Sequence, residues 1–112
     1  MTVDEAIAIF SSCSPGEKAE FLAGLMHDLT VLAREGYEVG GDGLADPKRA
    51  RRVNEIQHQV SAFLWALLRG DPRRYSDDAL VRIILEGHGD DRLARQLGES
   101  FVRLAGRHTT VA

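Results

Sequence analysis

Residues 46–70 read DPKRARRVNEIQHQVSAFLWALLRG, and this stretch decides the fold class. Asp46 followed by Pro47 is a helix start, because an N-cap carboxylate accepts hydrogen bonds from free amides and proline fits the first helical position. Apolar residues then recur every three or four positions, the signature of one helical face: Val53, Ile56, Val60, Phe63, Leu64, Leu67 and Leu68. Gly70 is a typical stop. The stretch predicts a helix over 47–69 with one buried face.

The same signals predict four further helices, over about residues 2–11, 14–35, 76–86 and 90–105. Thr2 and Glu5 have the spacing of a capping box, and Gly36, Gly87 and Gly106 are the expected stops. No strand pattern of convincing length occurs. We therefore predict an all-α fold, a compact bundle of about five helices with the helix over 47–69 at its centre. Residues 1–106 are expected to form a single helical domain and 107–112 a frayed C-terminal tail.

Composition favours a soluble protein. The chain has 112 residues, a formal net charge of −3 and a single cysteine, Cys13, which cannot form an internal disulfide. The first residues, MTVDE, are acidic and unlike a signal peptide. The longest nearly apolar run, 60–68, is about half the length of a membrane span. We expect a cytoplasmic protein that does not enter a membrane.

Trp65 does not fit the apolar face of its helix. It projects about 150° from the centre of that face, on the same side as His58 and Arg69. Either the helix is buried on every side, with the long loop over 36–45 or the last helix covering Trp65, or Trp65 belongs to a dimer or partner surface, where tryptophan is enriched. The second interpretation makes these residues the candidate partner-binding set: Trp65, His58, Arg69 and Tyr37.

A basic cluster occupies the start of the same helix and consists of Lys48, Arg49, Arg51 and Arg52. Cations are unfavourable there, because the free amides of a helix start already carry partial positive charge. The cluster is either neutralised within the fold by Glu35 and Glu38, or it holds an anion such as a phosphate or a nucleic-acid backbone. The acidic chain as a whole favours the structural explanation.

No pattern indicates catalysis, a cofactor or a metal. Glu55 and His58 have the spacing found in carboxylate-bridged di-iron bundles, but such sites need a second copy of the motif, which is absent. No phosphate-binding glycine loop with a following Lys-Ser or Lys-Thr occurs. Cys13 has no neighbouring base in sequence and is expected to be an ordinary structural thiol. We therefore expect that the protein is not an enzyme, and we predict no catalytic, cofactor or metal site.

The remaining observation concerns small residues in the last helix. Ala94, Gly98 and Ala105 share one sector, and a helical glycine costs about 1 kcal/mol relative to alanine. Gly98 is therefore expected to face a helix of the same chain or of a partner. We predict a non-enzymatic protein-interaction or regulatory domain that binds another protein, self-associating as a homodimer through the helices over 47–69 and 90–105. The alternative function is anion or nucleic-acid binding through the basic cluster.

Overall fold

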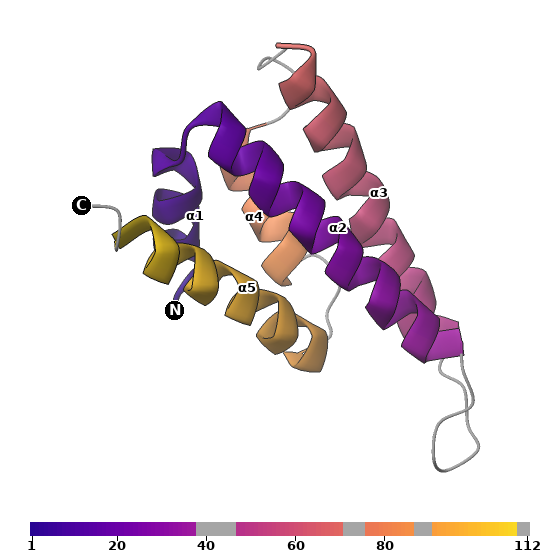
Figure 1. Cartoon of the computed structure of the whole chain (residues 1–112). Helices are drawn as coiled ribbons and strands as arrows, with labels where there is room; N and C mark the ends of the chain where they lie inside the picture. The colour runs from indigo at the N-terminus through magenta and orange to yellow at the C-terminus, as the bar shows by residue number, and fades with distance from the viewer. Residues whose placement is uncertain (38–46, 71–75, 87–90, 110–112) are drawn as a thin grey trace.

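The computed structural model describes residues 1–37, 47–70, 76–86 and 91–109. These residues form five helices: α1 (Val3–Ser12), α2 (Pro15–Tyr37), α3 (Pro47–Leu68), α4 (Asp77–Glu86) and α5 (Asp91–Thr109). No strand occurs among them. The predicted all-α bundle of five helices is confirmed (Figure 1).

The helix starts follow the signals in the sequence. Thr2 accepts from the amide of Glu5 at 3.1 Å, and the Glu5 carboxylate accepts from the amide of Thr2, which completes the predicted capping box of α1. Ser14 and Glu17 make the same reciprocal pair at the start of α2, at 3.0 and 3.2 Å. The Ser76 hydroxyl accepts from the amide of Ala79 at 3.1 Å at the start of α4. Local hydrogen bonds therefore begin all three helices.

The helix ends follow the glycines less closely. Gly70 has a φ of 70° and its amide donates to the carbonyl of Leu67, so the predicted stop of α3 is confirmed. Gly36 and Gly106 were wrong as stops, because α2 continues to Tyr37 and α5 to Thr109. Residues 107–109, expected in the frayed tail, are thus helical. Gly87, Asp90 and residues 110–112 lie outside the described residues.

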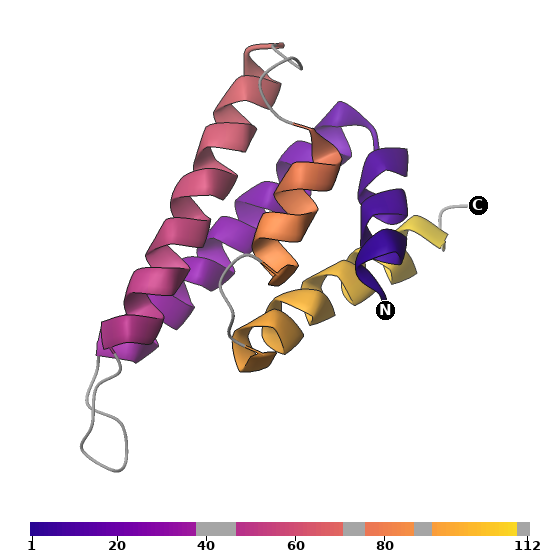
Figure 2. The same cartoon turned by 180° about the vertical axis from the view of Figure 1, so that it is seen from behind.

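The helices α2 and α3 lie side by side along their length in both views, and this is the most extensive helix–helix contact (Figures 1 and 2). The helices α1, α4 and α5 contact one another, and α4 also contacts α3. Phenylalanine rings join the elements: Phe10 of α1 lies 5.9 Å from Phe21 of α2 and 6.1 Å from Phe63 of α3. Phe21 lies 5.0 Å from Phe101 of α5. The core therefore includes residues from the pair α2 and α3 and from the helices α1, α4 and α5.

Candidate functional site

The helix α3 buries one long side and exposes the other. Its inner side contributes the buried residues Val53, Ile56, Val60 and Phe63. Figures 1 and 2 show α3 along one edge of the bundle, with no other drawn helix beyond it. Its opposite side carries six residues at alternating spacings of four and three, which we call the outer face of α3: Arg51, Glu55, His58, Ala62, Trp65 and Arg69. All of these except the half-buried Ala62 are exposed.

Trp65 is 58% exposed, so the interpretation that the last helix covers it was wrong. The loop over 36–45, the other expected cover, lies largely outside the described residues. The apolar run 60–68 extends beyond the buried face of α3, and the described helices that contact α3, α2 and α4, pack on its inner side. Leu68, one turn further along, is 62% exposed beside it. The guanidinium of Arg69 lies 5.9 Å from the centre of the Trp65 ring, in a cation–π contact that holds the two side chains together. A large aromatic surface is therefore displayed to solvent in a defined orientation.

The other predicted partner-binding residues divide into two groups. His58 lies on the outer face of α3, two helical turns before Trp65, and is exposed. Tyr37 is the last residue of α2, and its side chain lies outside the described part of the molecule. The structure thus brings His58, Trp65 and Arg69 onto one face, and it does not test Tyr37.

The basic cluster is only partly described. Lys48 and Arg51 are exposed on the first turns of α3, and Arg52 is half-buried. The side chain of Arg49 and the expected partners Glu35 and Glu38 lie outside the described side chains. Neutralisation within the fold and anion binding therefore both stay predictions.

The titratable groups considered for chemistry are Glu55 and His58, one turn apart on the exposed outer face of α3, and the buried Cys13. Among the described residues, no three His, Cys, Asp or Glu side chains lie close enough together to hold a metal ion. Cys13 is buried and its thiol donates to the carbonyl of Ile9 at 3.3 Å. Burial raises the pKa of Cys13, and the nearby Glu17 carboxylate raises this pKa further. A raised pKa lowers the thiolate fraction, which agrees with a structural thiol.

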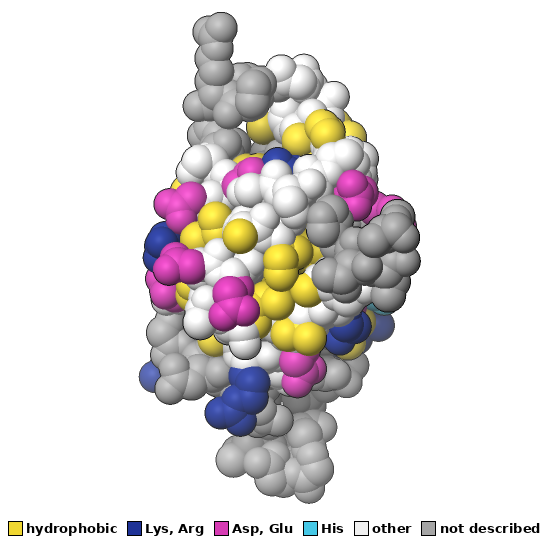
Figure 3. Space-filling view, turned by 90° about the vertical axis from the view of Figure 1, so that its left-hand side faces the viewer, with side chains coloured by type: hydrophobic (Ala, Val, Ile, Leu, Met, Phe, Trp, Pro, Cys, Tyr) yellow, Lys and Arg dark blue, Asp and Glu magenta, His cyan; other side chains and the backbone are white. Residues whose placement is uncertain are grey.

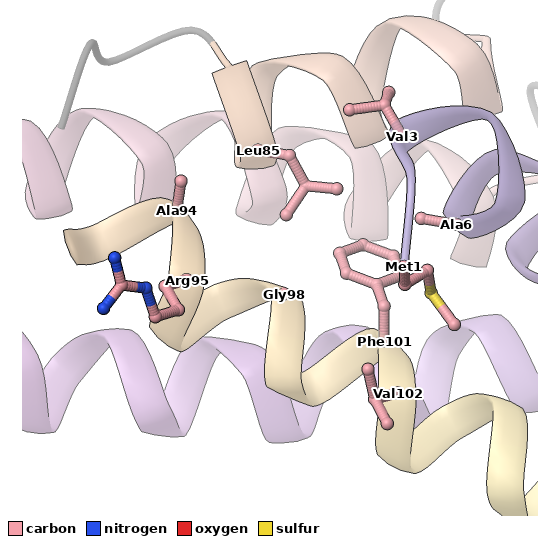
Figure 4. Close-up of a pocket in the computed structure, with 9 residues that line it drawn as sticks. All are labelled: Met1, Val3, Ala6, Leu85, Ala94, Arg95, Gly98, Phe101 and Val102. Carbon is pink, nitrogen blue, oxygen red and sulfur yellow. The ribbon is translucent and has the colours of Figure 1, made fainter. Parts of the chain in front are cut away.

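A pocket of about 310 Å³, which the sequence did not predict, lies between α1, α4 and α5 (Figure 4). Its lining residues are Met1, Val3, Ala6, Leu85, Ala94, Arg95, Gly98, Phe101 and Val102. Phe101 and Ala6 are fully buried, whereas Met1 is 53% and Val102 52% exposed at the mouth. Figure 3 looks onto the side of the molecule that carries α1 and shows apolar side chains gathered at its middle, with acidic side chains around them.

Gly98 forms part of the pocket wall. A Cβ atom placed on it would meet no atom within 4 Å, so the interpretation that Gly98 lets a helix of the same chain approach closely was wrong. Approach by a partner helix stays a prediction. The small residues Ala94 and Gly98 did mark this place in the sequence, but the other walls come from α1 and α4, whose approach no local pattern reveals.

Comparisons with known proteins add no assignment: no protein family model, curated protein or solved structure matches this chain. None of the helices in the described ranges combines the length and apolar character needed to cross a membrane.

Proposed function

We propose that this chain is a non-enzymatic, cytoplasmic protein-interaction domain that pairs with a second copy of itself through the outer face of α3. The observation that carries the proposal is Trp65, a large aromatic side chain that is 58% exposed and stacked with Arg69. Tryptophan and arginine are the residues most enriched at the energetic centres of protein interfaces. The exposed Leu68 extends the apolar surface around them.

The charge pattern of the outer face favours a second copy as the partner. Glu55 lies seven residues before Ala62, and Arg69 lies seven residues after it. Each is therefore about 10 Å from Ala62 along the helix axis, in opposite directions. When two copies of α3 lie antiparallel with their two-fold axis at Ala62, each Glu55 meets the Arg69 of the other copy. No described residue forms an ion pair with either side chain within one chain.

The same arrangement accounts for the residues nearer the axis. Ala62 is small, so the two helix backbones can approach closely at the crossing point. Trp65 then lies beside His58 of the other copy, one turn from the axis on each side. A parallel pair of α3 helices would instead oppose Glu55 to Glu55 and Arg69 to Arg69, which is repulsive. The proposed dimer is therefore antiparallel, and it is isologous, as two-fold symmetry requires.

Sedimentation equilibrium of the purified chain tests the proposal. We expect dimers, and we expect Trp65→Ala to weaken dimerisation at least about thirtyfold, because truncation of a hot-spot residue costs about 2 kcal/mol or more. Val31→Ala is the matched control, since Val31 is an exposed apolar residue of α2 away from this face. A wild-type chain that stays monomeric, or a dimer that tolerates Trp65→Ala as well as Val31→Ala, contradicts the proposal.

The antiparallel register has its own test. Glu55→Arg and Arg69→Glu should each weaken the dimer by placing like charges opposite one another. The double variant exchanges the two charges, so it should recover most of the lost affinity. A dimer that depends on Trp65 but is not restored in the double variant would mean that the surface is right and the register is wrong.

The alternative function, anion or nucleic-acid binding by the basic cluster, is kept as a second proposal. It is supported by the exposure of Lys48 and Arg51 at the start of α3, where free helix amides also point outward. We rank it second because the chain carries a net charge of −3 and no aromatic residue interleaves with the four bases to stack on nucleotides.

A further inference from the structure

The pocket between α1, α4 and α5 has the composition of a small-ligand site. Leu85 of α4 and Phe101 of α5 point into the same space, and Val3 and Ala6 of α1 close the opposite side (Figure 4). Arg95 is the only one of the nine lining residues with a charged side chain. A largely apolar cavity with a few placed polar groups is the usual form of a ligand pocket, and a volume of about 310 Å³ suits a small ligand.

Gly98 lines the pocket without a side chain that would fill it. A glycine inside a helix is unfavourable, and this one is not explained by packing, because a Cβ atom there would meet nothing within 4 Å. A larger side chain at this position would extend into the cavity beside Leu85 and Phe101. The locally unfavourable residue therefore keeps the space free, and a local departure from good helix chemistry is expected where a site is needed.

Arg95 sets the charge of the ligand. It lies at the end of the pocket next to Ala94, away from Met1 and Phe101, and its guanidinium points outward into solvent (Figure 4). No described acidic side chain pairs with it. Two acidic side chains that adjoin pocket residues in sequence, Asp4 and Glu86, are instead both paired with Arg82, at 3.5 and 3.7 Å. An anionic group at the Ala94 end of the pocket would therefore find an available cation.

We propose that this pocket binds a small aliphatic carboxylate. The alkyl chain lies between Leu85, Gly98 and Phe101, where its burial removes apolar surface from water. The carboxylate lies at the open Ala94 end, where it forms an exposed ion pair with the Arg95 guanidinium. The proposal uses no residue of the outer face of α3, so it stands or falls independently of self-association.

Titration with octanoate, followed by proton–nitrogen correlation spectra, tests the site. We expect saturable shifts of the amides of Leu85, Gly98 and Phe101, and weaker binding of 1-octanol, which has the same chain without the charge. Gly98→Leu should weaken octanoate binding more than tenfold by filling the cavity. Gly24→Leu is the matched control, because Gly24 is a glycine within α2 at which an added Cβ atom would also meet nothing within 4 Å.

Two further variants test the carboxylate end. Arg95→Gln should weaken octanoate by up to about fivefold, the effect of one exposed ion pair, and leave 1-octanol unchanged. Glu99→Gln, which removes a negative charge next to Gly98, should strengthen octanoate slightly. The proposal is overturned if octanoate shifts no pocket amide, if Gly98→Leu binds it as well as Gly24→Leu does, or if octanoate and 1-octanol bind alike.

Discussion

Lys18 links the start of α2 to the start of α4 through an ion pair that is largely withdrawn from solvent. Its ammonium lies 2.8 Å from the Asp77 carboxylate, and the two side chains are only 16% and 24% exposed. The same ammonium lies 5.4 Å from the centre of the Phe10 ring. One side chain of α2 therefore contacts both α1 and α4, which a surface lysine does not usually do.

This pair predicts unequal effects at two adjacent aspartates. Asp77→Asn should lower the free energy of unfolding by about 1–3 kcal/mol, because it leaves a partly buried ammonium without its charged acceptor. Asp78→Asn is the control in the same first turn of α4, and its exposed pair with Arg82 should contribute less than about 1 kcal/mol. Urea denaturation measures both. Equal effects would show that Lys18 is as well solvated as an ordinary surface lysine.

Among the elements, α5 and α3 each contain or adjoin a glycine, and the two glycines differ in backbone conformation. Gly98 lies within this helix in ordinary helical geometry, whereas Gly70 follows α3 with a φ of 70°, which other residues rarely adopt. Neither would crowd a neighbour if it carried a Cβ atom. Only backbone conformation distinguishes them.

Alanine substitution at these two glycines should therefore change stability in opposite directions. Gly98→Ala should raise the free energy of unfolding by about 0.5–1 kcal/mol, because alanine is the better helix former and the space is open. Gly70→Ala should lower it by about 1–2 kcal/mol, because the left-handed conformation is strained for alanine. Thermal melting of both variants checks the signs. A destabilised Gly98→Ala would indicate that the pocket is narrower than the structure shows.

Across the whole molecule, charge is divided unevenly. Residues 1–46 contain nine acidic and two basic residues, whereas residues 47–74 contain seven basic and two acidic ones. The proposed dimer uses one charge of each sign, Glu55 and Arg69, at positions where two-fold symmetry brings opposite signs together. Of the basic cluster, only Arg51 belongs to the outer face of α3, so Arg49 and Arg52 lie outside the proposed contact.

The two proposed functions therefore predict different results for Arg49→Gln combined with Arg52→Gln. If self-association through the outer face of α3 is the function, this double variant should dimerise like the wild type and lose less than about 1 kcal/mol of stability for each exposed pair removed. Fluorescence anisotropy with a labelled DNA duplex provides the second readout. Tight binding by the wild type that weakens with salt and is lost in the double variant would instead favour the anion-binding proposal.

The sequence by itself determined the number of helices, where three of them begin and where α3 ends. These features depend on interactions within a few residues: the reciprocal bonds of Thr2 with Glu5 and of Ser14 with Glu17, the Ser76 cap, and the positive φ of Gly70. The buried side of α3 was predictable for Val53, Ile56, Val60 and Phe63, because a spacing of three and four fixes which residues share a face. The prediction that Leu68 lies on the same face was wrong, because Leu68 is 62% exposed. The predictions that α2 stops at Gly36 and α5 at Gly106 were wrong, because a glycine ends a helix only where the backbone turns out of the helix.

Only the tertiary structure decided what covers each face. The exposure of Trp65 depends on α2 and α4 packing along one side of α3 and on no described helix lying beyond the other, which no local spacing encodes. The open space beside Gly98 likewise depends on how α1 and α4 approach α5. Both features arise between segments distant in sequence, where the free energy of packing acts on whole faces and not on neighbouring residues.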